Sequence, residues 1–221
     1  KRGTPMDFEL ARRNMVASQV RTNEVTDPLV IDAIGQVPRE KFLPAARQSL
    51  AYVDEDLEVA NGRWLMEPMV AARLLQLADV QRSDHVLVLP CGTGYIAAVL
   101  AHMAGSIVAA EADGPTKDSA AKLLAELGAD TVAVVSATVA DGCPGQAPFD
   151  VIVFDGAVSE IPDELKQQLA DGGRLVAVVQ NGPIGQATLV QRTGEAFGHR
   201  TEFDASVPVL PEFSAKPAFV F

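Results

Sequence analysis

Cysteine and positively charged side chains are scarce in this chain of 221 residues. Cysteine occurs only at Cys91 and Cys143, far apart and without Cys-x-x-Cys spacing, which argues against a disulfide framework or a zinc site. The 18 lysines and arginines are outnumbered by 29 aspartates and glutamates, so the formal net charge is −11. Because binding to nucleic acid depends on neutralising phosphates with basic side chains, this balance argues against a nucleic-acid partner.

Long apolar runs are also absent. None approaches the roughly 20 residues needed to span a bilayer, so we expect no membrane partner. Lys1–Pro5 precede Met6 and lack the apolar core of a signal peptide; we interpret them as a cloning remnant outside the fold. The three histidines show no metal-ligand spacing, and we predict no metal site. Together with the isolated cysteines, these features predict a cytoplasmic protein.

From residue 84 onward, β-branched runs alternate with helical segments. We predict strands over 85–89, 106–111, 131–136, 149–154 and 173–179 and helices over 95–103, 115–127 and 160–169. This alternation indicates an α/β fold with a mostly parallel, doubly wound sheet covered by helices on both faces. Three further segments, 187–192, 198–203 and 218–221, are predicted to be the last strands.

The N-terminal third has a different pattern. Apolar spacing predicts helices over 7–20, 27–36 and 69–78, with Pro28 at the first position of the second helix. Residues 45–66 show no clear period and are predicted to be irregular. We therefore expect a single domain over 6–221, in which a helical cap (6–80) covers an α/β core (84–221).

The stretch between the first two strands of that core is the main candidate site. Gly92 and Gly94 follow the strand at 85–89 and precede a helix, an arrangement that offers backbone N–H groups to a nucleotide-like ligand. Glu111 ends the next strand about 20 residues further on, where an acid accepts hydrogen bonds from ribose hydroxyls. The alternative for Glu111 is a solvated residue at a strand terminus.

Two other residues near strand ends have alternative interpretations. Asp155 follows the strand at 149–154, so its carboxylate either lines the ligand crevice and acts as a base, or caps the next helix. Cys91 is interpreted as a small buried residue rather than as a nucleophile.

Several segments, in order along the chain, resemble the protein-L-isoaspartate O-methyltransferase family. They are Val37-Pro38-Arg39-Glu40-Lys41-Phe42-Leu43-Pro44, Ala51-Tyr52-Val53-Asp54, Val86 to Leu100, Phe149-Asp150-Val151-Ile152-Val153 and Gln168 to Val176. The resemblance implies a Rossmann-like methyltransferase fold, S-adenosylmethionine as cofactor, and a protein or peptide as methyl acceptor. It assigns the cofactor to Gly92, Gly94, Tyr95, Glu111 and Thr138, and it places Trp64 and Met66 at the family's threonine and serine pocket positions.

The departures from the family pattern lie at those same positions. Val88 stands in place of an acid, Pro90 in place of a glycine, and Thr138 in place of an aspartate, which predicts weak or absent cofactor binding. Trp64 and Met66 cannot replace the hydroxyl pair, so activity on isoaspartate is expected to suffer. Arg63 is either a new anion anchor or a solvated surface residue.

Two functions remain open from the sequence. The first is an S-adenosylmethionine-dependent methyltransferase for protein carboxyl methylation and repair. The alternative is a catalytically inactive protein of the same fold that acts as a binding or regulatory partner. The methyl acceptor and the oligomeric state are not determined by these patterns.

Overall fold

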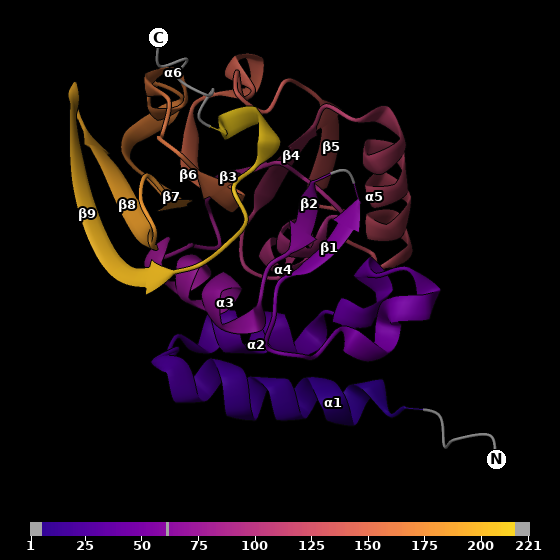
Figure 1. Cartoon of the computed structure of the whole chain (residues 1–221). Coiled ribbons are helices and arrows are strands. Elements are labelled where there is room, and N and C mark those ends of the chain that lie inside the picture. Colours follow the sequence, from indigo (N-terminus) through magenta and orange to yellow (C-terminus); the bar gives the residue numbers. More distant parts are fainter. Residues whose placement is uncertain (1–5, 61, 215–221) are drawn as a thin grey trace, which may run out of the picture.

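A seven-stranded sheet forms the centre of the molecule, as Figure 1 shows. The computed structural model describes residues 6–60 and 62–214. The strand order is β5-β4-β3-β6-β7-β8-β9, parallel from β5 to β7 and antiparallel for β8 and β9. The bounds are β3 His85–Leu89, β4 Ser106–Glu111, β5 Val132–Ser136, β6 Phe149–Val158, β7 Leu169–Val179, β8 Gly185–Thr193 and β9 Ala196–Ala205.

The parallel α/β sheet predicted from the sequence is confirmed. β3 pairs in parallel with β4 on one side and with β6 on the other, so the chain winds outward in both directions from β3. Both faces of β3 are buried: Val86 and Val88 belong to one apolar cluster, and Leu87 and Leu89 to the other. Burial on both faces explains why the central strands are continuous apolar runs in the sequence.

Helices and short turns cover the sheet. Their bounds are α1 Phe8–Met15, α2 Pro28–Gln36, α3 Pro68–Leu77, α4 Tyr95–Ala101, α5 Gly114–Glu126 and α6 Asp163–Lys166. α2 begins as predicted, because the Asp27 carboxylate accepts a hydrogen bond from the Leu29 N–H at 2.8 Å and Pro28 occupies the first turn. In the described part of the chain, no helix is long and apolar enough to cross a membrane.

Two expectations about the elements are wrong. The helix expected over 160–169 is only the single turn of α6, because the Gln168 carbonyl accepts from the Phe149 N–H at 2.8 Å and Leu169 begins β7. The segment 45–66, expected to be irregular, contains a 3-10 turn (Ala45–Leu50) and an antiparallel hairpin of β1 (Leu57–Ala60) and β2 (Arg63–Leu65). The predicted strand 218–221 and the remnant at 1–5 lie outside the described residues.

Arg39 connects the N-terminal region to the core. Its side chain is 0% exposed, and it donates from Nε to the Ala51 carbonyl at 2.7 Å and from Nη2 to the Met66 carbonyl at 2.6 Å. Its guanidinium also lies 4.8 Å from the ring centroid of Tyr95, at the start of α4. One side chain thus links the residue after the 3-10 turn Ala45–Leu50, the residue after the hairpin, and the first helix of the core.

Replacing Arg39 with methionine should therefore destabilise the protein by about 3 kcal/mol, because two buried carbonyls lose their donors. Urea unfolding monitored by circular dichroism measures the change. Arg13→Met is a matched control on the exposed face of α1 and should shift stability by less than about 0.5 kcal/mol. Equal effects of the two substitutions would contradict this role of Arg39.

Candidate cofactor cleft

The turn between β3 and α4 lies at the carboxyl edge of the parallel strands, next to the end of β4. Gly92 and Gly94 both have positive φ, +53° and +93°, which favours glycine. A Cβ at Gly94 would lie 3.1 Å from a Leu124 methyl of α5, a tight contact that would force Leu124 to shift. The predicted turn is present at this position, and its backbone conformation explains why both residues are glycine.

Three backbone N–H groups of this turn donate to acceptors within the protein. The Cys91 N–H donates to the Ala110 carbonyl at 2.7 Å, and the Gly94 N–H donates to the Cys91 carbonyl at 2.9 Å. The Gly92 N–H donates to Oε2 of Glu111 at 3.0 Å. All three N–H groups therefore already have acceptors within the protein.

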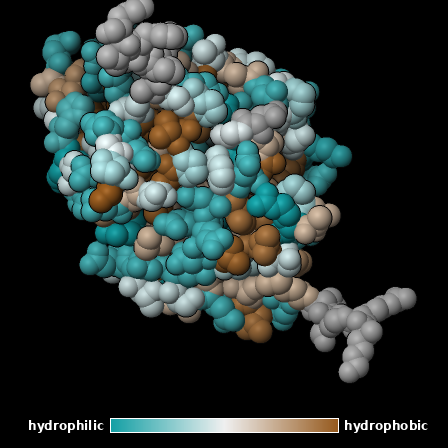
Figure 2. All heavy atoms as spheres, in the orientation of Figure 1, coloured by the Kyte–Doolittle hydropathy of each residue, from teal (hydrophilic) through white to brown (hydrophobic). Residues whose placement is uncertain are grey.

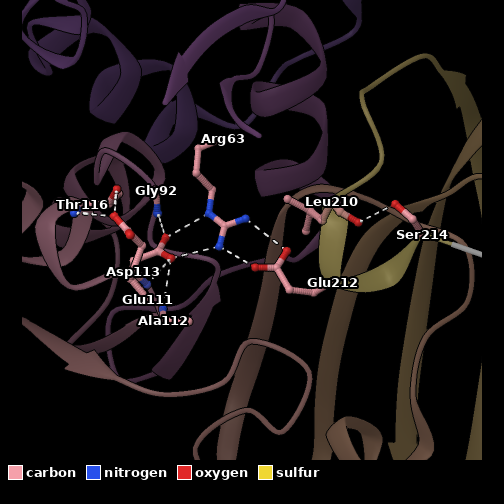
Figure 3. A network of polar contacts seen from close by, with 9 residues as sticks. All are labelled: Arg63, Gly92, Glu111, Ala112, Asp113, Thr116, Leu210, Glu212 and Ser214. Atoms are coloured by element: carbon pink, nitrogen blue, oxygen red, sulfur yellow. Dashed lines mark hydrogen bonds and ion pairs between the residues drawn. The ribbon is translucent and has the colours of Figure 1, made fainter. Parts of the chain in front are cut away.

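Glu111 is fully buried at the end of β4 and accepts from five donors, as Figure 3 shows. Oε1 accepts from the Ala112 N–H at 3.0 Å, the Asp113 N–H at 3.2 Å and Arg63 Nη2 at 2.9 Å. Oε2 accepts from Arg63 Nε at 3.1 Å and from the Gly92 N–H. A carboxylate offers about four lone-pair positions, so these donors saturate it. The interpretation of Glu111 as a solvated residue is wrong.

Arg63 extends from β2 and lies between two carboxylates. Besides Glu111, it contacts Glu212, with Nη2 at 2.6 Å from Oε1 and Nη1 at 3.1 Å from Oε2. Burial by itself lowers the pKa of Arg63, but the hydrogen bonds to both glutamates outweigh burial and raise its pKa above the usual value. Arg63 is 6% exposed, so its interpretation as a solvated surface residue is wrong.

Sequence reasoning missed Glu212. This residue lies in a short 3-10 turn, Pro211–Phe213, and pairs with an arginine 149 positions earlier in the chain. No motif surrounds it, so no local signal in the sequence indicates its partner. Although desolvation by itself raises the pKa of Glu212, the hydrogen bonds from Arg63 hold it below the usual value.

Asp155 lies within β6 rather than at its end, and its carboxylate approaches the glycine turn. Its Oδ2 would be 3.9 Å from a Cβ placed at Gly92. The helix-cap interpretation is wrong, because the next helix, α6, begins at Asp163. Asp155 is 8% exposed, and desolvation raises the pKa of its carboxyl to about 7, although the nearby Arg39 and Arg63 lower it.

The other predicted site residues are spread around this turn. Trp64 is half-buried in β2, whereas the Met66 side chain is buried in the apolar core. Tyr95 is buried with its ring against Arg39 and edge-on to Phe42 at 5.4 Å between ring centroids. Exposed Thr138 follows β5 on the same edge of the sheet as Glu111, whose carbonyl accepts from the Ala137 N–H at 3.4 Å. The buried thiol of Cys91 has a pKa raised by desolvation, consistent with a packing role.

An open cleft of about 650 Å³ lies beside the turn. Its walls come from the segment 41–44, from β1 and from one side of α5 along its length, and Thr93 of the turn also lines it. The face in Figure 2 is mainly hydrophilic, with separate hydrophobic patches between the charged side chains. The cleft combines hydroxyl groups of Thr116 and Ser119 with apolar side chains such as Phe42 and Leu123.

Asp155→Asn should change how stability depends on pH. The carboxyl pKa rises from 3.8 to about 7 on folding, so the folded state retains the proton and the wild-type protein loses stability between about pH 4 and pH 7. Asparagine cannot ionise, and the variant should be more stable than the wild type at pH 8 by on the order of 4 kcal/mol. That difference should shrink steadily toward pH 4.

Thermal unfolding of both proteins at pH 4, 6 and 8 measures this dependence. Asp118→Asn changes an exposed carboxylate on α5 and serves as the control with little pH-dependent difference. A stabilisation by Asp155→Asn that is equal at all three pH values would show that ionisation of Asp155 is not its cause.

Comparison with known families identifies the chain. The profile of the protein-L-isoaspartate(D-aspartate) O-methyltransferase family matches residues 11–208. The chain belongs to this family. Protein-L-isoaspartate O-methyltransferase 2 of Anaeromyxobacter sp. (strain Fw109-5) is 39% identical over 212 residues, covering 96% of this chain and 85% of the relative. The enzyme named protein-L-isoaspartate O-methyltransferase in Koribacter versatilis (strain Ellin345) is 34% identical and covers 96% of both chains.

Solved structures of the family share the fold. One protein-L-isoaspartate O-methyltransferase superposes with a TM-score of 0.79 at 24% identity, over 90% of this chain and 65% of the other. A family protein from Plasmodium falciparum, in complex with S-adenosyl-L-homocysteine, superposes with a TM-score of 0.76 at 16% identity, over 94% of this chain and 99% of the other. At these low sequence identities, the superpositions show a shared Rossmann-like fold alone.

The family resemblance implies a ribose on Glu111, and this arrangement does not fit one. A ribose hydroxyl would donate to the Glu111 carboxylate, whose acceptor positions are already taken by three backbone N–H groups and Arg63. Val88 and Pro90 add no polar side chain to the turn, and Val88 is buried in the apolar core. In this conformation the Glu111 carboxylate has no acceptor position left for a ribose hydroxyl.

Proposed function

We propose that this chain is an S-adenosylmethionine-dependent methyltransferase that esterifies a carboxylate of an isoaspartyl residue in a protein or peptide. The family match over residues 11–208 is the observation that carries the proposal. Two relatives bearing that enzyme name are matched across 85% and 96% of their own length, so the comparison concerns nearly the whole protein. The parallel sheet and the glycine turn support it, because ligands of such sheets bind at the carboxyl ends of the strands.

The chemistry asks little of the protein beyond positioning. A carboxylate acceptor is already ionised at neutral pH and is itself the nucleophile, so a strong general base is not required. We assign cofactor binding to Gly92, Gly94, Tyr95, Glu111 and Thr138, at the edge of the sheet beside the cleft. The acceptor side is assigned to Asp155 and Trp64, while buried Met66 shapes the wall behind them. Binding of the cofactor is proposed to be weak, because Val88 and Thr138 stand in place of acids and Pro90 removes a backbone N–H.

The proposed compartment is the cytoplasm. Both cysteines, Cys91 and Cys143, are free and buried. This is the state expected of thiols in a reducing environment, where disulfides do not persist.

Incubation with radiolabelled S-adenosylmethionine and an isoaspartyl peptide tests the function. We expect slow, saturable formation of a base-labile methyl ester on this peptide. The same peptide with an ordinary aspartyl residue is the matched control and should remain unlabelled.

Two other results would change the assignment. Cofactor binding without transfer to the isoaspartyl peptide would indicate a different acceptor. Absence of transfer, together with absence of cofactor binding by the wild type and by the variants described below, would favour the non-catalytic binding partner.

A further inference from the structure

The Glu111 carboxylate has two candidate partners that cannot be satisfied together. One is the guanidinium of Arg63, which donates to both of its oxygens. The other is a hydroxyl-bearing ligand at the end of β4, as the proposed function requires. Three backbone N–H groups hold Glu111 in either case, so removing Arg63 would leave the carboxylate hydrogen-bonded and able to accept from a ligand.

Glu212 determines how firmly Arg63 occupies this position. Glu212 accepts from Nη1 and Nη2 of the guanidinium, whereas Glu111 accepts from Nε and Nη2. Arg63 is thus held between two carboxylates. Arg63 and Glu111 are almost fully buried, while the Glu212 side chain is 26% exposed. Charge-assisted, bidentate contacts in such a desolvated place are among the stronger polar interactions in proteins.

The segment that carries Glu212 is anchored against β6. The Ala157 N–H donates to the Pro208 carbonyl at 3.1 Å, and the Leu210 N–H donates to the Ala157 carbonyl at 2.8 Å. The ring of Phe213 packs edge-on against Phe154, with centroids 5.4 Å apart. These contacts place Glu212 over the ends of the central strands.

Two glycines allow this close approach. A Cβ at Gly156 would lie 2.6 Å from Leu210, and a Cβ at Gly62 would lie 2.7 Å from Pro211. Both distances are too short for real side-chain contacts, and both glycines have positive φ. The hairpin turn and β6 thus both lack a side chain where the segment 210–212 is seated.

We infer that Arg63 is an internal occupant of the ribose position and that Glu212 holds it there, so that the Glu111 carboxylate is closed to the ribose of an adenosyl ligand until this pair opens. The inference rests on the proposed function for the identity of the ligand. Arg63 is accordingly a residue that sets cofactor affinity by competition rather than by contact with the cofactor. The measured dissociation constant is then the intrinsic one divided by the fraction of molecules in which Glu111 is free.

Two variants that weaken the closed state provide the test. Glu212→Gln removes one of the two charges that hold Arg63 and keeps the shape of the side chain. The double variant Arg63→Met and Glu212→Gln removes the guanidinium together with its second carboxylate, and it retains an aliphatic stem beside Gly92. Glu195→Gln, in the exposed turn between β8 and β9, makes the same charge change away from the cleft and is the matched control.

Calorimetric titration with S-adenosylhomocysteine measures the affinity of each protein, and thermal unfolding confirms that each is folded. We expect the double variant to bind at least about tenfold more tightly than the wild type, the Glu212→Gln variant to lie between them, and the Glu195→Gln control to match the wild type. Methionine, which lacks the ribose, should show no such gain.

The outcomes separate this inference from the proposed function. Equal binding by the wild type and both variants would overturn the inference alone and leave the methyltransferase assignment in place. Weaker binding by the double variant would also overturn it, because Arg63 would then be part of the binding site. If folded variants and the wild type all fail to bind, the inference is wrong and the proposed function falls with it.

Discussion

A buried carboxylate must have hydrogen-bond donors, and the organisation of this cleft follows from that requirement at Glu111. The donors come from three places in the chain: the turn after β3, the turn after β4 and the hairpin strand β2. The guanidinium of Arg63 has further N–H groups that need acceptors, and Glu212 supplies them from near the end of the described chain. Because desolvated charges are costly unless paired, these segments are constrained to meet at one point.

The chain has the fold of its family, and the end of β4 in this fold carries an internal ion pair. The parallel sheet, the glycine turn and the acid at the end of β4 are all present in the usual order. The acid, however, is neutralised from within the protein, and Asp155 beside the turn has a raised pKa because water is largely excluded there. A ribose at the end of β4 would therefore have to compete with an intramolecular ion pair for the Glu111 carboxylate.

The parts predicted well from sequence are those with a local period. Strands 85–89 and 106–111 have the predicted bounds, because a strand that is buried on both faces shows as a nearly continuous apolar run. Asp27 and Pro28 correctly marked the start of α2. The helix expected over 160–169 is a single turn, because the hydrogen bond between Phe149 and Gln168 places the chain in the sheet from that point on. The hairpin of β1 and β2 was missed because its strands are too short to show a period.

The sequence by itself determined the family, the direction of the central strands, the turn with Gly92 and Gly94, and the acid at the end of β4. These features depend on patterns within about 20 residues, which the amino-acid order displays directly. Only the tertiary structure decided that Arg63 is buried on Glu111, that Glu212 holds its other edge, and that Asp155 faces the turn from inside a strand. Charge pairing acts through space between residues 48 and 149 positions apart, and no local pattern records which partner the fold will bring into contact.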